Sequence, residues 1–316
     1  MKRRGVLLLS VLAMSAAVSG SPASGAGQTT PWQPAAGLDQ IPIWPDAIPI
    51  QRPESSDAER VIPSSHPVGG RPWTFITNVS RPTMTVYPAA APNTGAAVMV
   101  FPGGGYYGVA IDLEGSEICD WITTQGLTCI LLKYRSPQDW HKGGRHRAPA
   151  VQLALQDAQR AMGLVRQRAA EYGIDPRRIG VIGFSAGGHL VTAISNADAR
   201  TYAAVDAADA QPCRPDFAIA LYPGHLWAGK DLDLYPWNRI SPKAPPTLLV
   251  QSFDDPVDDV HNALAYAMAL RQSKVPVEMH LYAQGGHAFG LRPTASPITT
   301  EWPQLALKWL HSIKVL

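Results

Sequence analysis

The sequence predicts an α/β protein with a mostly parallel central sheet and helices on both faces. From residue 73 onward, strand-like segments alternate with helix-like segments, which is typical of such a sheet. Several of the strand-like segments are continuous apolar runs, as expected for strands that are buried on both faces. The composition agrees, because the 316 residues are 46% hydrophobic and only 16% charged, which excludes a disordered chain.

Local patterns predict the first half of this sheet. Residues 83–87 and the apolar run 96–101 are expected to be strands, and the second of them ends at a glycine-rich turn. A helix is expected over 114–125, since Gly126 is suited to its C-terminal cap, and the next strand covers 127–133. Strand and helix therefore already alternate before the middle of the chain.

The longest amphipathic pattern begins near Pro149, a residue favoured in the first turn of a helix, and ends before Gly173. Between them, apolar residues recur with spacings of four and three, which predicts one apolar helix face over about six turns. A helix of small and aliphatic residues is expected after Ser185. The remaining predicted elements are strands at 179–184, 217–222, 247–251 and 277–282, with a helix over 257–272 between the last two.

The chain before residue 73 has a different character. Residues 1–26 are predicted to be a secretory signal peptide, because basic residues precede an apolar stretch that is too short to span a bilayer, and small residues follow. Residues 27–72 are rich in proline and are expected to form an extended arm on the surface of the main domain, 73–316. We therefore expect a periplasmic or secreted protein with no membrane contact after cleavage.

A candidate nucleophile lies where the strand 179–184 ends. Ser185 is the centre of Gly183-Phe184-Ser185-Ala186-Gly187, a G-x-S-x-G pattern between a buried strand and a helix. In that context a sharp turn lifts the serine hydroxyl into an open cleft. The pattern alone is weak, and a glycine turn with a helix-capping serine is the alternative explanation.

A nucleophilic serine needs a base, and the base needs an acid that orients it. His287 lies in a glycine-rich turn after the last predicted strand, and Asp255 lies just after the preceding strand. Each group is therefore expected at the carboxyl end of a parallel strand. The chain order Ser185, Asp255, His287 is the order found in α/β-hydrolases.

The acid has neighbours of the same type. Asp254, Asp255 and Asp258 form one cluster, and acids of this kind also cap helices. We favour Asp255 over Asp254, because Asp255 lies four residues after Gln251, where the strand is predicted to end. The choice between Asp254 and Asp255 stays open at this point.

A glycine run supplies a candidate oxyanion hole. Gly103-Gly104-Gly105 follows a buried strand, and glycines let backbone N–H groups approach a developing negative charge. We expect the donors to be Gly104, Gly105 and Ala186, the residue after the nucleophile. A plain tight turn is the alternative, whereas a phosphate loop is excluded because no G-K-[ST] follows.

These motifs resemble those of a known family. The runs Phe101-Pro102-Gly103-Gly104-Gly105-Tyr106, Lys133-Tyr134-Arg135, Gly183-Phe184-Ser185-Ala186-Gly187-Gly188-His189 and Gly285-Gly286-His287 are similar to secreted bacterial α/β-hydrolases of the acetyl xylan esterase type, over about residues 42–315. The resemblance implies an α/β-hydrolase fold, a Ser–Asp–His triad and no metal or other cofactor. It also implies removal of small acyl groups, above all acetyl, from acetylated carbohydrate such as xylan through an acyl-enzyme. The histidine that opens the glycine loop of lipase and esterase relatives is replaced by Pro102.

Candidate substrate contacts lie around the predicted site. Residues 224–246 are expected to form a short lid that carries Trp227 and Trp237, and Tyr106 follows the glycine run. These aromatic rings suit stacking on sugars, with packing of the lid as the alternative. The loop 136–147 contains basic residues, which we expect to be solvated rather than to attract acidic sugar groups.

Other features leave alternatives open. Cys119 and Cys129 either face one another as a disulfide or remain buried thiols.

A serine peptidase of the prolyl oligopeptidase type shares the triad order, but usually carries a large second domain, for which the arm 27–72 is too short. A non-catalytic carbohydrate-binding relative would not need all three triad residues. The 27 basic and 25 acidic residues argue against a nucleic-acid partner, the expected partner is an acetylated oligo- or polysaccharide, and the oligomeric state is open.

Overall fold

The computed structural model describes residues 31–46, 58–90, 92–136 and 149–316. The predicted signal peptide, 1–26, lies outside these residues, and so does nearly all of the predicted basic loop, 136–147. None of the helices in the described part of the chain is long and apolar enough to cross a membrane.

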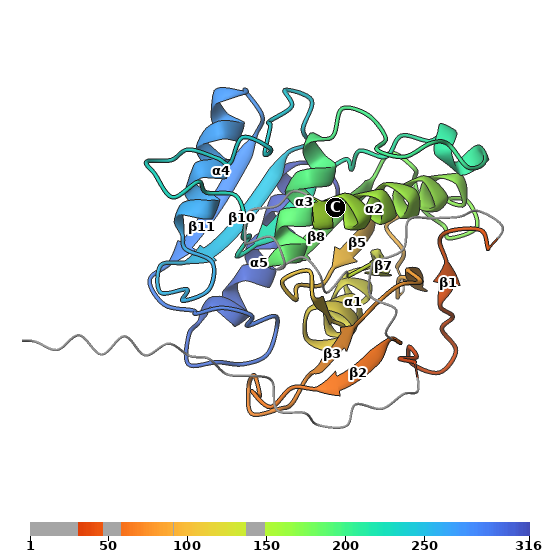
Figure 1. Ribbon diagram of the computed structural model, residues 1–316, viewed down its shortest axis with the longest axis horizontal. Helices are drawn as coiled ribbons and strands as arrows, with labels where there is room; N and C mark the ends of the chain where they lie inside the picture. The colour runs from red at the N-terminus through yellow and green to blue at the C-terminus, as the bar shows by residue number, and fades with distance from the viewer. Residues whose placement is uncertain (1–30, 47–57, 91, 137–148) are drawn as a thin grey trace, which may run out of the picture.

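An eight-stranded sheet runs through the centre of the molecule (Figure 1). Its strand order is β1-β4-β7-β5-β8-β9-β10-β11, and the six strands from β7 to β11 in that order are parallel, whereas β1 and β4 pair antiparallel at one edge. The strands are β1 Ile41–Pro42, β4 Thr83–Tyr87, β5 Ala97–Phe101, β7 Thr128–Lys133, β8 Ile179–Phe184, β9 Ala218–Leu221, β10 Thr247–Ser252 and β11 Val277–Tyr282. The seven predicted strands are all present, to within one residue at each end.

Helices cover both faces of this sheet. Helices α2 and α3 pack together in front of the central strands in Figure 1, and α5 lies behind them. Helix α1 shares the face of α5, because the rings of Trp121 and Trp302 meet at 5.3 Å. The helices are α1 Glu117–Thr124, α2 Pro149–Gln167, α3 Ala186–Asn196, α4 His261–Gln272 and α5 Ile298–Ser312. The expected fold class, a mostly parallel sheet with helices on both faces, is confirmed.

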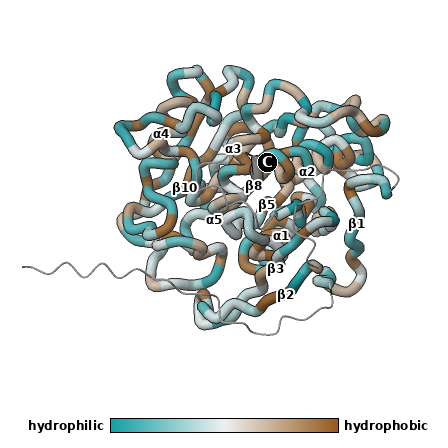
Figure 2. Tube along the Cα trace, in the orientation of Figure 1, coloured by the Kyte–Doolittle hydropathy of each residue, from teal (hydrophilic) through white to brown (hydrophobic). Residues whose placement is uncertain are grey.

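The core lies between the sheet and its helices. Every residue of β5, β7, β8, β9 and β10 is buried, which explains why these strands are apolar along their whole length. Figure 2 shows the hydrophobic residues gathered along the central strands. The edge strand β11 is only partly buried.

A second, smaller sheet was not predicted from the sequence. The strands β2 (Arg60–Pro63), β3 (Thr74–Thr77) and β6 (Gly108–Ala110) pair antiparallel in the order β2-β3-β6. Two residues separate the glycine run from strand β6, and Ala110 N donates to the carbonyl of Gly103 at 2.9 Å. This sheet therefore supports the loop that the sequence assigns to the oxyanion hole.

The proline-rich segment is tied into the domain. Strand β1 extends the main sheet, and Ile43 and Trp44 are buried. The Trp44 indole donates to Asp157 Oδ1 at 2.7 Å, and Arg160 Nε donates to the carbonyl of Ile43 at 2.9 Å. Both partners lie on α2, so the described part of this segment is anchored to a core helix.

Three helix boundaries differ from the predicted ones. Helix α2 ends at Gln167 rather than near Tyr172. The helix expected over 114–125 begins with a π-helical turn, Asp112–Ser116, before α1. Helix α4 begins at His261 rather than Val257, because the preceding residues form a turn around a carboxylate of the site described below.

The cysteines also form a definite arrangement. Cys119 on α1 and Cys129 on β7 form a disulfide, with a Cα–Cα distance of 5.2 Å. Cys213 is a free, partly buried thiol. The disulfide links a helix to the amino-terminal end of the strand that follows it.

Candidate active site

The three predicted triad residues are joined by hydrogen bonds. Ser185 follows β8, Asp255 follows β10 and His287 follows β11, so all three lie at the carboxyl ends of parallel strands. His287 Nε2 lies 3.0 Å from Ser185 Oγ, and His287 Nδ1 lies 2.7 Å from Asp255 Oδ2. This is the geometry of a nucleophile, a base and an orienting acid.

The structure distinguishes the two candidate acids. The Asp255 side chain is fully buried, and its second oxygen accepts from the backbone N–H groups of Val257 and Asp258 at 2.8 and 2.9 Å. Asp254 instead accepts from the N–H groups of Gly285 and Gly286, both at 2.8 Å, and these bonds lower the pKa of its carboxyl. Asp254 therefore shapes the loop that carries the histidine, while Asp255 contacts the imidazole itself.

Ser185 occupies a strained turn between β8 and α3. Its φ of 52° and ψ of −118° are unusual for a residue other than glycine, and such conformations cost about 1–3 kcal/mol. Surrounding hydrogen bonds hold the turn, since Ser185 N donates to the carbonyl of Leu221 and the carbonyl of Ser185 accepts from His189 N. The strain directs the hydroxyl into the cleft rather than along the helix.

The glycine run and the start of α3 flank this hydroxyl. Gly104 and Gly105 line the same cleft as Ser185 and His287. Gly104 has a φ of 137°, and a Cβ there would lie 2.3 Å from the carbonyl oxygen of Gly108, so only glycine fits. Ala186 is the first residue of α3, and an N–H at that position has no partner within its helix. The predicted donors thus lie around the nucleophile.

A buried carboxylate holds the glycine loop through a hydrogen bond to its backbone. Glu114 Oε2 accepts from Gly103 N at 2.8 Å, and its other oxygen accepts from the Tyr222 hydroxyl at 2.8 Å. Burial raises the pKa of Glu114, although both hydrogen bonds oppose the rise. The π-helical turn that carries Glu114 is therefore part of the site.

Neighbouring carboxylates raise the pKa of His287. Burial alone disfavours the imidazolium, but the hydrogen bond and charge of Asp255, followed by the charges of Asp258 and Glu114, outweigh it and raise the pKa of His287. The ring of Tyr222 packs against the imidazole at 4.9 Å. The site therefore stabilises the protonated imidazole, the form that a general base reaches in the transition state.

Tyr106, expected to contact the substrate, is a structural residue instead. Its side chain is completely buried, and its hydroxyl lies 2.8 Å from His189 Nδ1. Burial lowers the pKa of His189 to about 3, which keeps this imidazole neutral. The prediction failed because the turn after the glycine run directs the ring into the core rather than into the cleft.

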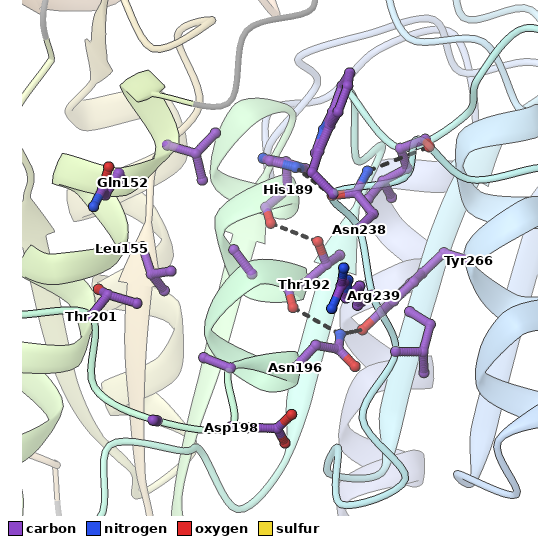
Figure 3. Close-up of a pocket in the computed structure, with 17 residues that line it drawn as sticks. Gln152, Leu155, His189, Thr192, Asn196, Asp198, Thr201, Asn238, Arg239 and Tyr266 are labelled. Atoms are coloured by element: carbon purple, nitrogen blue, oxygen red, sulfur yellow. Dashed lines mark hydrogen bonds between the residues drawn. The ribbon is translucent and has the colours of Figure 1, made fainter.

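The two predicted tryptophans lie in different cavities. Trp227 lines the cleft of Ser185, a space of about 680 Å³, and stacks on His261 at 4.4 Å. Trp237 lines a neighbouring cavity of about 410 Å³ that contains none of the triad residues. Figure 3 shows this second cavity, with His189 and Asn238 near one end and Asp198 near the other. Trp237 is thus not a contact of the cleft, but its ring stacks at 4.4 Å on Tyr235, which does line the cleft.

The lid segment is fixed by side chains rather than by regular structure. Asn262 Oδ1 accepts from the N–H groups of Leu226 and Trp227, and Asn238 Oδ1 lies 3.2 Å from His189 Nε2.

In the described residues, no group of three or more His, Cys, Asp or Glu side chains is arranged to hold a metal ion.

Curated relatives match the chain at modest identity. An acetylxylan esterase of Xylanibacter ruminicola is 28% identical over 62% of this chain and 42% of its own length. An ethyl acetate hydrolase of Pseudomonas putida is 26% identical over 62% of this chain and 66% of its own length. The chain thus spans less than two thirds of these relatives. The similarity to acetyl xylan esterases, predicted from the motifs, is confirmed.

Solved structures match over most of the chain. An acetyl ester-xyloside bifunctional hydrolase of Caldicellulosiruptor lactoaceticus is 29% identical, with a TM-score of 0.67 over 88% of this chain and 97% of that one. An esterase of Thermogutta terrifontis, 21% identical with a TM-score of 0.61 over 75% of this chain and 91% of that one, shares the fold. The family model described as the prolyl oligopeptidase family matches residues 123–312. That match covers more than half of the sequence, so the chain belongs to the prolyl oligopeptidase family and has the α/β-hydrolase fold.

Proposed function

We propose that the protein is a serine carboxylic ester hydrolase that removes small acyl groups, above all acetyl, from acetylated carbohydrate. The observation that carries the proposal is the hydrogen-bonded series Ser185, His287 and Asp255 in an open cleft. The relatives support ester rather than peptide hydrolysis, since those named above are an acetylxylan esterase, an ethyl acetate hydrolase and an acetyl ester-xyloside bifunctional hydrolase. The signal-peptide pattern supports a periplasmic or secreted location.

In this mechanism Ser185 Oγ attacks the ester carbonyl while His287 Nε2 takes its proton. Asp255 holds the imidazole in the tautomer that presents a free Nε2 and stabilises the imidazolium. The N–H groups of Gly104, Gly105 and Ala186 bind the tetrahedral oxyanion, and each such donor contributes about 3–4 kcal/mol to lowering the barrier. His287 then protonates the leaving alcohol, and water hydrolyses the acyl-enzyme by the same steps.

The carbohydrate part of the proposal is supported by the walls of the cleft. Four aromatic side chains line it, which are Trp73, Tyr107, Trp227 and Tyr235. Aromatic faces suit the C–H surfaces of sugar rings, and their polar edges remain able to bind hydroxyls. The half-exposed carboxylate of Asp259 adds a hydrogen-bonding group at the same wall.

The direct test is acetate release from acetylated xylo-oligosaccharides by the wild type and by Ser185→Ala, with an aryl acetate and a peptide p-nitroanilide as comparison substrates. We expect serine-dependent acetate release and no peptide cleavage. Trp227→Ala should raise KM for the oligosaccharide but leave the aryl acetate unchanged, and Trp237→Ala should raise that KM less, because Trp237 reaches the cleft only through its stacking on Tyr235. Cleavage of the aryl acetate without acetate release from oligosaccharides would remove the carbohydrate assignment, and faster cleavage of the peptide would remove the esterase assignment.

A further inference from the structure

An acidic side chain outside the triad contacts the nucleophile. Asp258 Oδ2 lies 3.2 Å from Ser185 Oγ, so that it competes with His287 Nε2 for the hydroxyl hydrogen, and it lies 3.8 Å from His287 Nε2. Its side chain is only 14% exposed. Neither proton abstraction nor oxyanion binding uses this carboxylate, so its position beside the reacting atoms requires another explanation.

The surrounding structure holds Asp258 in place. Its N–H donates to Asp255 Oδ1 at 2.9 Å, and its carbonyl accepts from Gln251 Nε2 at 2.8 Å. Its carboxylate packs over Gly224, where a Cβ would lie 2.3 Å from Asp258 Oδ1. The carboxylate is therefore fixed by the triad acid on one side and by the start of the lid segment on the other.

This position is on the leaving-group side of the site. His287 Nε2 is the atom that returns the proton to the departing alcohol, so the leaving oxygen must approach it closely. Asp258 lies beside that same nitrogen, whereas the oxyanion donors come from the glycine run and the start of α3. An alcohol that leaves past His287 therefore passes next to the Asp258 carboxylate.

The charged side chains that line the described part of the cleft around Asp258 are acidic. The acidic residues that line the described part of the cleft are Glu114, Asp258 and Asp259, and none of the described lining residues is Lys or Arg. Both oxygens of Glu114 are occupied by Gly103 N and the Tyr222 hydroxyl, and Asp259 is half-exposed and paired with His261 at 2.6 Å. Asp258 is thus the carboxylate best placed to act on a substrate.

We propose that Asp258 determines which leaving alcohols the enzyme accepts, by favouring neutral or cationic ones and rejecting those that carry a carboxylate near the ester. This inference rests on the proposed function. It narrows the substrate class to acetyl groups on uncharged sugars, and it makes an acetyl group beside a uronic acid a poor substrate. The physical basis is Coulomb repulsion between two carboxylates in a partly desolvated cleft.

The test uses two acetyl esters of nearly the same shape, 3-acetoxybenzoate and 3-acetoxybenzamide, which differ in charge. We compare the ratio of their kcat/KM values in the wild type, Asp258→Asn and Asp258→Ala, so that any change in triad efficiency cancels. Removing the carboxylate should raise the relative kcat/KM of the benzoate about tenfold at low salt. The gain should shrink at high salt, where charges are screened. For the cationic ester (3-acetoxyphenyl)trimethylammonium, the ratio to the benzamide should fall.

Asp259→Asn is the matched control, because this carboxylate lines the same cleft but is 55% exposed and paired with His261. It should change the ratio by less than about twofold. An unchanged ratio in both Asp258 variants would overturn the inference, even if both esters were cleaved more slowly, because Asp258 would then act only through the triad. If the wild type cleaved neither neutral nor charged acetyl ester, the proposed function itself would fail.

Discussion

Replacing Asp255 by Asn should reduce kcat/KM for an aryl acetate by about 10⁴-fold, which corresponds to about 5.4 kcal/mol in the barrier. The fully buried Asp255 carboxylate lies 2.7 Å from His287 Nδ1. An amide N–H in that place would favour the tautomer with the hydrogen on Nε2. That nitrogen could then no longer accept the proton of Ser185 Oγ, 3.0 Å away.

The matched variant is Asp254→Asn. Asp254 uses one oxygen to accept from Gly285 N and Gly286 N, and an amide oxygen can keep both bonds. Only the charge contribution to these bonds is lost, on the order of 1 kcal/mol, so the rate should fall by less than about tenfold. The two variants thus differ by about three orders of magnitude although they alter adjacent aspartates.

The assay is kcat/KM on an aryl acetate, with thermal unfolding measured on the same samples. Asp255→Asn should remain folded, because the amide oxygen can still accept from the N–H groups of Val257 and Asp258. Equal losses in the two variants, or a larger loss in Asp254→Asn, would refute the assignment of the triad acid.

Further predictions concern the base, the oxyanion loop and the disulfide. Because the pKa of His287 is raised and the base must be neutral, activity should be lost as pH falls through a value above the ordinary 6.5. In Asp258→Asn, which lacks one of the charges that raise it, the acidic limb of the pH–kcat/KM profile should move to lower pH. Gly104→Ala should lower kcat about 10²–10³-fold, since its Cβ collides with a backbone carbonyl and displaces the loop; steady-state kinetics alongside circular dichroism measures this. Replacing Cys119 and Cys129 together by Ala should lower the free energy of unfolding by about 2–3 kcal/mol in denaturant titrations, because the bridge closes a short loop. An unchanged midpoint and slope would contradict that estimate.

The central sheet could be predicted from the sequence because each of its strands except β1 is a short apolar or alternating run of residues that is recognisable by itself. The strands β4, β8 and β11 begin and end at the predicted residues, and the apolar run of β8 reflects burial on both faces. The site residues followed from the same pattern, since side chains just after parallel strands gather at one edge of the sheet. Ser185, Asp255 and His287 therefore meet although 102 residues separate the first from the last.

The smaller sheet could not be predicted in this way. It pairs Arg60 with Thr77 and Thr77 with Gly108, and its strands are only three or four residues long, so no local periodicity distinguishes them from loops. Helix α5 was also missed. Its sequence contains Pro303, which lowers helix propensity and, as the sixth residue of the helix, removes the N–H that would bond the carbonyl of Thr299. The helix forms nonetheless, because Trp302 and Trp309 bury their side chains in the core.

Side-chain direction was the other limit of sequence reasoning. Tyr106 and Trp237 were selected for their chemistry, but backbone geometry places one in the core and the other in a neighbouring cavity. Asp258 was recognised only as a member of an acidic cluster. Helix α4 begins only at His261, and the turn before it directs the Asp258 carboxylate toward Ser185 instead of toward a helix terminus.

The most direct test of the account is covalent labelling of the wild type and Ser185→Ala with a fluorophosphonate ester that traps serine nucleophiles, followed by intact mass and peptide mapping. We predict one label per wild-type chain, on Ser185, with loss of aryl acetate hydrolysis in proportion to labelling. We predict neither label nor hydrolysis in the variant. A label on another residue, or hydrolysis that survives in Ser185→Ala, would contradict the assignment of Ser185 as the nucleophile.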